Sequence, residues 1–147
     1  MTISNSALLD ANILIYSHQS LSEFHAQSRE ILEKGLRREL SLCICPQVIC
    51  EFYAVVTKPR RVTNPISAEE ATAEIEKYLY VQNILMIYPG PGIMDATLDL
   101  LKRYGVTKQK IFDLQLVATM LINNITHIYT FNQDDFSQFK EIEVLEP

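Results

Sequence analysis

The chain has 147 residues, a length typical of one domain, and 48% of them are hydrophobic, which is enough to form a buried core. The formal net charge of −5 excludes a broad basic surface of the kind that coats nucleic acid. No apolar run approaches the roughly 20 residues that span a bilayer, and residues 1–5 lack a secretory signal, so we expect a single domain in the cytoplasm.

Apolar periodicity predicts strands that alternate with helices. The expected strands are residues 7–9, 42–45, 84–88, 127–130 and 142–145. The expected helices are a short one after Asp10, then residues 22–40, 46–57, one that starts at Ser67, 93–104 and 112–123. Ser67 and Glu70 have the spacing of a capping box, and Gly105 is a typical residue at a helix end. This alternation predicts an α/β fold with a parallel sheet covered on both faces.

The cysteines Cys43, Cys45 and Cys50 lie in one short apolar stretch. Their odd number, in a chain without a signal, argues against a disulfide framework. We expect all of them to be reduced, structural and buried.

Acidic residues follow the predicted strands. Asp10 comes directly after the first strand, Glu51 lies in the helix after the second, and Asp135 lies just past the fourth. In open parallel sheets, sites form at the carboxyl ends of the strands. We therefore expect these acids to meet at one edge of the sheet.

Glu51 and Asp113 lie on helices with many apolar neighbours, which predicts that both carboxylates are drawn toward the interior. Burial of a carboxylate is costly unless a cation or hydrogen bonds compensate it. Simpler interpretations exist for each acid taken alone. Asp10 or Asn12 could cap a helix, Glu51 could pair with an arginine, Asp113 could be a helix N-cap, and an acid at residues 134–135 could be solvated.

The chain resembles the PIN-domain family, and within it the VapC-like toxins of bacterial toxin–antitoxin pairs. The matching segments are Leu8-Leu9-Asp10-Ala11-Asn12, Cys50-Glu51-Phe52, Ile111-Phe112-Asp113 and Thr130-Phe131-Asn132-Gln133-Asp134-Asp135-Phe136. The resemblance implies the strand order 3-2-1-4-5 and a metal-dependent ribonuclease. It also implies an antitoxin partner and a homodimer.

By the same resemblance, the metal-site acids are Asp10, Glu51, Asp113 and Asp135. We prefer Asp135 to Asp134 because Asp135 directly precedes Phe136, as in the family's Asp-Phe ending. Asn12 and Asn132 are expected to support the site. Many family members carry an aspartate at the position of Asn132, and an amide supplies no charge for a second metal ion.

Oxygen ligands favour hard cations, so the expected cofactor is Mg²⁺ or Mn²⁺. In this hypothesis the ion activates water and neutralises charge on the phosphate of an RNA substrate. The basic residues expected to contact RNA phosphates are Lys58, Arg60, Arg61, Lys108 and Lys110, and Arg103 is a further candidate.

Two other α/β classes and a non-catalytic role compete with this interpretation. A receiver-like signalling domain needs an acidic pair after the first strand, and Asp10 has no acidic neighbour. A haloacid-dehalogenase-type phosphatase needs a second aspartate where this chain has Asn12. The third alternative is a PIN fold that binds RNA or a protein partner without cleaving RNA.

Overall fold

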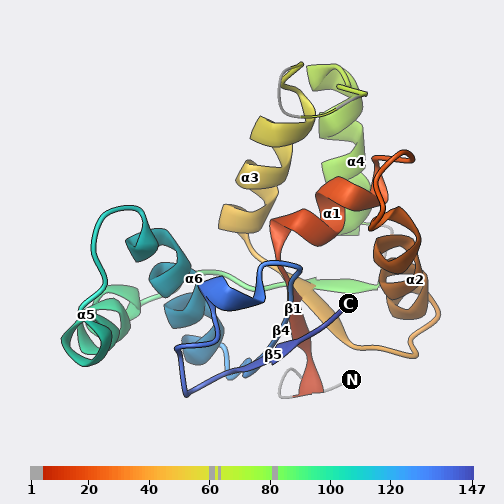
Figure 1. The fold of residues 1–147 in the computed structure, drawn as a ribbon. Helices are drawn as coiled ribbons and strands as arrows, with labels where there is room; N and C mark the ends of the chain where they lie inside the picture. Colours follow the sequence, from red (N-terminus) through yellow and green to blue (C-terminus); the bar gives the residue numbers. More distant parts are fainter. Residues whose placement is uncertain (1–4, 60–61, 63, 81–82) are drawn as a thin grey trace.

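The computed structural model describes residues 5–59, 62, 64–80 and 83–147, which form alternating strands and helices (Figure 1). The strands are β1 (Ala7–Leu9), β2 (Leu42–Ile44), β3 (Ile84–Met86), β4 (His127–Tyr129) and β5 (Glu143–Leu145). The helices are α1 (Ala11–Ser17), α2 (His25–Leu36), α3 (Pro46–Val56), α4 (Ala68–Tyr80), α5 (Ile93–Tyr104), α6 (Lys110–Ile122) and the short 3₁₀ turn η2 (Gln133–Asp135).

The strands form one parallel sheet in the order β3-β2-β1-β4-β5, which confirms the predicted α/β class and strand order. Leu9 at the end of β1 lies opposite Tyr129 at the end of β4. This register brings the segment after residue 9 next to the segment after residue 129, at one edge of the sheet.

The helices fall into two groups, with α5 and α6 on one side of the strands and α1 to α4 on the other (Figure 1). Helix α6 packs much of its apolar sequence into the core. Its buried residues are Leu114, Leu116, Val117, Ala118, Thr119 and Met120. Among the described residues, no helix is long and apolar enough to cross a membrane.

The predicted elements are confirmed, with differences at their ends. The largest difference is α2, which is shorter than the predicted residues 22–40. Turns precede it, in which the His25 N–H donates to the Ser22 carbonyl, and it ends just before Arg38, whose φ of 62° no longer fits a right-handed helix. The predicted capping contact is present, because the Glu70 N–H donates to Ser67 Oγ at 3.1 Å.

The cysteines are all free, and the prediction that all are buried is wrong for one of them. Cys43 and Cys45 are buried, and desolvation raises the pKa of the Cys43 thiol to about 12. Cys50 is exposed, because it lies off the buried apolar stripe of α3.

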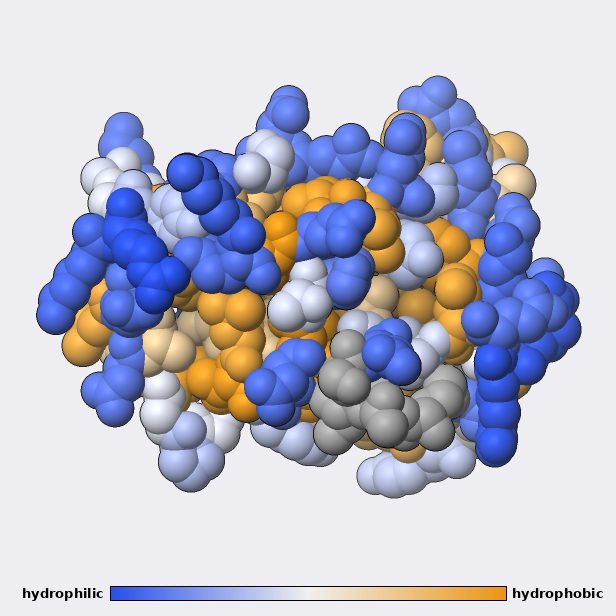
Figure 2. Space-filling model, turned by 90° about the horizontal axis from the view of Figure 1, so that it is seen from below, coloured by the Kyte–Doolittle hydropathy of each residue, from blue (hydrophilic) through white to orange (hydrophobic). Residues whose placement is uncertain are grey.

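The molecular surface mixes hydrophilic side chains with apolar patches, as the face in Figure 2 shows. Exposed large apolar residues include Met94 and Leu98, which lie one helical turn apart on α5. Scattered apolar residues are normal on a protein surface, whereas these two form an adjacent pair on one helix.

Candidate active site

Asp10 is held by hydrogen bonds at the point where β1 passes into α1. Its side chain is 8% exposed, and its Oδ1 accepts the Ala11 N–H at 2.8 Å. Its Oδ2 accepts the Thr130 hydroxyl at 2.8 Å and the Asn12 amide at 3.4 Å. The capping interpretation of Asp10 is therefore correct, and it leaves the carboxylate at the sheet edge where a site was expected.

Thr130 connects the two central strands through its hydroxyl and was not among the predicted site residues. It is fully buried directly after β4, and its Oγ1 also accepts the Asn12 amide at 3.1 Å and the Asn132 N–H at 3.0 Å. The signal in the sequence was a small hydroxyl residue at the end of a buried strand, two places before Asn132. Such a residue orients a carboxylate without being a ligand.

Asn12, predicted as a supporting residue, is buried and ties α1 to the segment after β4. Besides its amide contacts, its Oδ1 accepts the Phe131 N–H at 3.4 Å. The Phe131 ring packs against Tyr16 and Phe24, with ring centroids 5.4 Å and 4.4 Å apart. These contacts fix the start of the segment that carries Asn132 and Asp135.

Glu51 is exposed, so the prediction that it points toward the interior is wrong. The buried stripe of α3 contains Val48, Ile49, Phe52, Val55 and Val56. Glu51 lies at the border of that stripe, beside the exposed Ala54, where helical spacing alone does not separate core from rim. Its side chain instead lines two cavities, described below.

Asp113 lies in the first turn of α6 and is half-buried, with 32% of its side chain exposed. The N-cap of this helix is Gln109, so the N-cap interpretation of Asp113 is wrong. Its expected core-facing position is also only partly correct. Leu116 and Val117 are buried one turn later, but Asp113 lies at the N-terminal end of the helix, where side chains are partly exposed to solvent.

Asp135 ends η2 and approaches Asp113 through Lys110. The Lys110 ammonium lies 3.5 Å from Asp113 Oδ2 and 3.5 Å from Asp135 Oδ1. It also donates to the Asp135 backbone carbonyl at 2.9 Å. One lysine thus joins two of the predicted acids from separate parts of the chain.

The acids share one electrostatic environment. Burial raises the pKa of Asp10, and the negative charges of Asp113 and Asp135 raise it further, against the hydrogen bonds from Thr130 and Ala11. Burial, followed by the charge of Asp135, also raises the pKa of Asp113, whereas Lys110 acts to lower it. The charge of Asp135 therefore contributes to the raised pKa of both Asp10 and Asp113, whereas Asp134 is an exposed residue of η2.

Two cavities meet at Glu51. The first, of about 210 Å³, is lined by Asp10, Asn12, Ile15, Tyr16, Glu51, Val55 and Asn132. The second, of about 600 Å³, is lined by Gln47, Glu51, Gln109, Lys110, Phe112 and Asp113. Glu51 lines both, so the carboxylates of Asp10 and Asp113 border adjoining hollows on the same side of the molecule.

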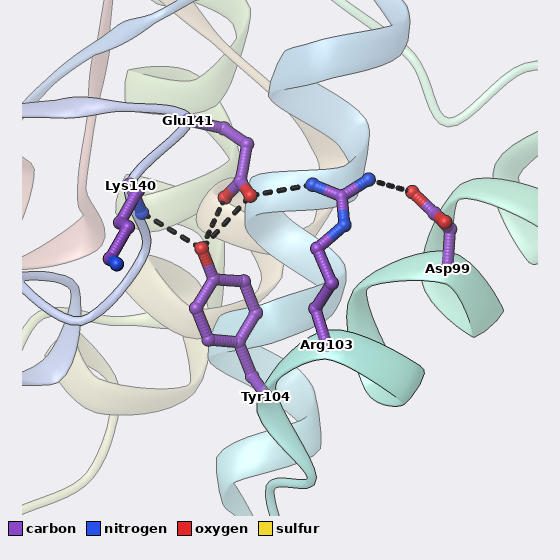
Figure 3. A network of polar contacts seen from close by, with 5 residues as sticks. All are labelled: Asp99, Arg103, Tyr104, Lys140 and Glu141. Carbon is purple, nitrogen blue, oxygen red and sulfur yellow. Dashed lines mark hydrogen bonds and ion pairs between the residues drawn. The ribbon is translucent and has the colours of Figure 1, made fainter.

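The basic residues differ in their surroundings. Lys58 and Lys108 are exposed, while the predictions for Arg60 and Arg61 lie outside the described residues. Arg103 pairs with Asp99 and Glu141, in a network that also holds the Tyr104 hydroxyl (Figure 3). Its guanidinium is thus engaged within the protein.

The donor chemistry of the site fits a hard divalent cation, because carboxylate oxygens are the ligands that Mg²⁺ and Mn²⁺ prefer. The negative charges of Asp113 and Asp135 contribute to the raised pKa of Asp10, and the charge of Asp135 contributes to the raised pKa of Asp113, as expected of carboxylates that lie near one another. Among the described residues, however, no group of three or more acidic, histidine or cysteine side chains is close enough to hold an ion. Side chains would have to rotate to close around one.

Comparison with known proteins identifies the family. The family model described as PIN domain matches residues 7–142. The chain belongs to the PIN-domain family. Ribonuclease VapC43 of Mycobacterium tuberculosis is 27% identical over 139 residues, which cover 95% of this chain and 93% of that protein.

Solved structures of low sequence identity share the PIN fold. DNA-bound VapBC from Salmonella typhimurium has a TM-score of 0.68 at 17% identity, covering 99% of this chain and 98% of that chain. VapC20 of Mycobacterium tuberculosis, described as a Sarcin-Ricin loop cleaving toxin, has a TM-score of 0.67 at 12% identity, covering 90% and 95%. The receiver-like alternative is excluded by the PIN match and by the strand order, since receiver domains have the order 2-1-3-4-5.

Proposed function

We propose that this PIN-domain protein is a Mg²⁺- or Mn²⁺-dependent ribonuclease that acts as the toxin of a toxin–antitoxin pair. The observation that carries the proposal is geometric: Asp10, Glu51 and Asp113 line two cavities that meet at Glu51, and Lys110 joins Asp135 to Asp113. The relatives named as VapC ribonucleases, which match nearly the whole chain, support the same activity.

In the proposed site, Asp10, Glu51, Asp113 and Asp135 would hold the metal, and a bound ion would supply positive charge to polarise water and the phosphate. Thr130 and Asn12 hold the Asp10 carboxylate in one orientation through hydrogen bonds to Oδ2. Asn132, which lines the smaller cavity, would contact water or phosphate without adding charge.

RNA would reach the acids across the two cavities that meet at Glu51. The exposed Lys58 and Lys108 are proposed to contact its phosphates, as are Arg60 and Arg61. Such contacts add affinity that falls with salt concentration. If the substrate is cellular RNA, the protein acts in the cytoplasm, where that RNA is found.

The proposed partners are an antitoxin and a second copy of the chain. The solved structure from Salmonella typhimurium is of a VapBC complex bound to DNA, which supports an antitoxin partner here. For the homodimer, the exposed Met94 and Leu98 on α5 offer an apolar contact face.

The direct test is cleavage of a set of structured RNAs with and without Mn²⁺ or Mg²⁺. We expect metal-dependent cleavage by the wild type and none by the Asp10→Asn Asp113→Asn double variant. Asp135→Asn should also abolish cleavage, and the matched control Asp134→Asn should keep it, because Asp134 is exposed whereas Lys110 joins Asp135 to Asp113.

Cleavage that persists in the double variant, or that needs no metal, would refute the proposed chemistry. Intact RNA together with calorimetric Mn²⁺ binding in the wild type would instead favour the non-catalytic PIN alternative.

A further inference from the structure

We propose that Lys110 is a positioning residue, whose ammonium group is a built-in counter-charge that holds Asp113 and Asp135 together and competes with a divalent ion for them. The inference rests on the proposed function for its metal-binding part. Its first part, the counter-charge, concerns the metal-free protein alone.

The contacts of Lys110 point into the acidic site. Its Nζ donates to the Asp135 carbonyl at 2.9 Å and lies 3.5 Å from one carboxylate oxygen each of Asp135 and Asp113. Only 29% of the Lys110 side chain is exposed. By comparison, Lys108 is exposed two residues earlier. The ammonium of Lys110 is therefore placed by the acids and is not a freely solvated surface charge.

The position of Lys110 in its helix supports a role for these contacts. Lys110 is the first residue of α6, where the helix dipole disfavours a positive charge. Asp113, three residues later, lies on the same side of the helix, and Asp135 approaches from η2. The contacts with these two acids offset the unfavourable position of the lysine.

A divalent ion bound by the same carboxylates would lie close to this ammonium and be repelled by it. The segment that carries Asp135 does not depend on Lys110 alone, because Phe136 and Phe139 are each 1% exposed and anchor it in the core. Removal of the lysine charge should therefore increase the repulsion between the two carboxylates and lower stability, but keep their backbone segments in place and make the site more attractive to a cation.

The first experiment measures thermal stability in metal-free buffer. We expect Lys110→Met to lower the melting temperature, Lys110→Arg to restore most of it, and the control Lys108→Met to change it little. In an Asp113→Asn Asp135→Asn background, Lys110→Met should have almost no effect. A loss of the same size in both backgrounds would refute the counter-charge.

The second experiment measures Mn²⁺ binding by calorimetry and by the melting shift on adding Mn²⁺. We expect a several-fold lower Kd and a larger shift for Lys110→Met than for the wild type, with Lys110→Arg near the wild type. An unchanged or higher Kd for Lys110→Met would overturn the competition. Absence of any Mn²⁺ or Mg²⁺ binding to the wild type would overturn both the competition and the proposed metal site. The thermal melts in metal-free buffer would still test whether Lys110 is the counter-charge of Asp113 and Asp135.

Discussion

Asp10 shows how one residue can serve structure and chemistry together. Its Oδ1 caps α1 through the Ala11 N–H, while its Oδ2 is held by the hydroxyl of Thr130. The capping role therefore fixes the orientation of the carboxylate that we propose as a metal ligand. Because both contacts involve buried groups, the loss of either one should change the orientation of the Asp10 carboxylate.

Thr130 gives the first prediction at this scale. Thr130→Val removes the hydroxyl that donates to Asp10 at 2.8 Å, and Thr130→Ser keeps it. Loss of such a partner of a ligand typically costs about 10–100-fold in activity or metal affinity. We expect a loss of this size for the valine variant and only a small loss for serine, measured as RNA cleavage rate and Mn²⁺ Kd. A valine variant with wild-type values would show that the hydroxyl does not orient Asp10.

The raised pKa values of Asp10 and Asp113 give the second prediction. Burial is the main cause of both shifts, so the folded protein binds these protons more tightly than the unfolded chain. In metal-free buffer, this contribution makes stability fall as pH rises from the ordinary value of 3.8 through the folded-state pKa values. The Asp10→Asn variant has no carboxyl group at position 10, so it lacks the part of this pH-dependent loss of stability that Asp10 causes.

The melting temperature of Asp10→Asn relative to that of the wild type should therefore increase as the pH is raised above the ordinary aspartate pKa of 3.8. Thermal melts of both proteins across this range test the expectation, and the exposed Asp134→Asn is the matched control. A difference between Asp10→Asn and wild type that does not vary with pH would contradict the shift.

Among the elements, the segment between η2 and β5 is the one whose position determines where Asp135 lies. Phe136 and Phe139 are buried, and the Tyr104 ring packs on Phe139 with centroids 5.0 Å apart. The Tyr104 hydroxyl donates to the Glu141 carboxylate at 2.8 Å and accepts the Lys140 N–H at 2.9 Å (Figure 3). The end of α5 is thus attached to the segment that follows Asp135.

Tyr104→Phe tests this attachment, because it keeps the ring and removes only the hydroxyl. Loss of hydrogen bonds that include a charged partner should cost about 1–2 kcal/mol and lower the melting temperature by about 2–4 °C per kcal/mol. Tyr80→Phe is the control, since Tyr80 is 81% exposed. Equal melting temperatures for Tyr104→Phe and the wild type would show that the network adds no stability.

For the whole molecule, the parallel order β3-β2-β1-β4-β5 places the ends of β1 and β4 side by side. Helices α3 and α6 then bring Glu51 and Asp113 to adjoining cavities at that edge. The acids come from segments that are far apart in the chain, so an ion that they share would link those segments and stabilise the folded state.

Added Mn²⁺ or Mg²⁺ should therefore raise the melting temperature of the wild type. At 100 times the Kd, the gain is about 2.7 kcal/mol, which corresponds to about 5–10 °C for a protein of this size. Thermal melts at increasing metal concentration measure this shift, and the Asp10→Asn Asp113→Asn variant should show none. A shift of equal size in that variant would place the bound metal elsewhere.

The sequence by itself determined the α/β class and nearly all the strands and helices, because hydrophobic periodicity and helix caps act over a few neighbouring residues. It also marked Asp10, whose position after β1 depends only on where that strand ends. The motif resemblance added the strand order and the family, which the structure and the family match confirm.

Only the tertiary structure decided which groups lie beside these acids. Thr130 reaches Asp10 from 120 residues away, and Lys110 reaches Asp135 from 25 residues away. Glu51 is exposed because the packing of α3, and not its sequence pattern, sets the border of the buried face. Periodicity reports the average environment of a helix face, whereas a site depends on side chains that distant segments bring within hydrogen-bonding distance.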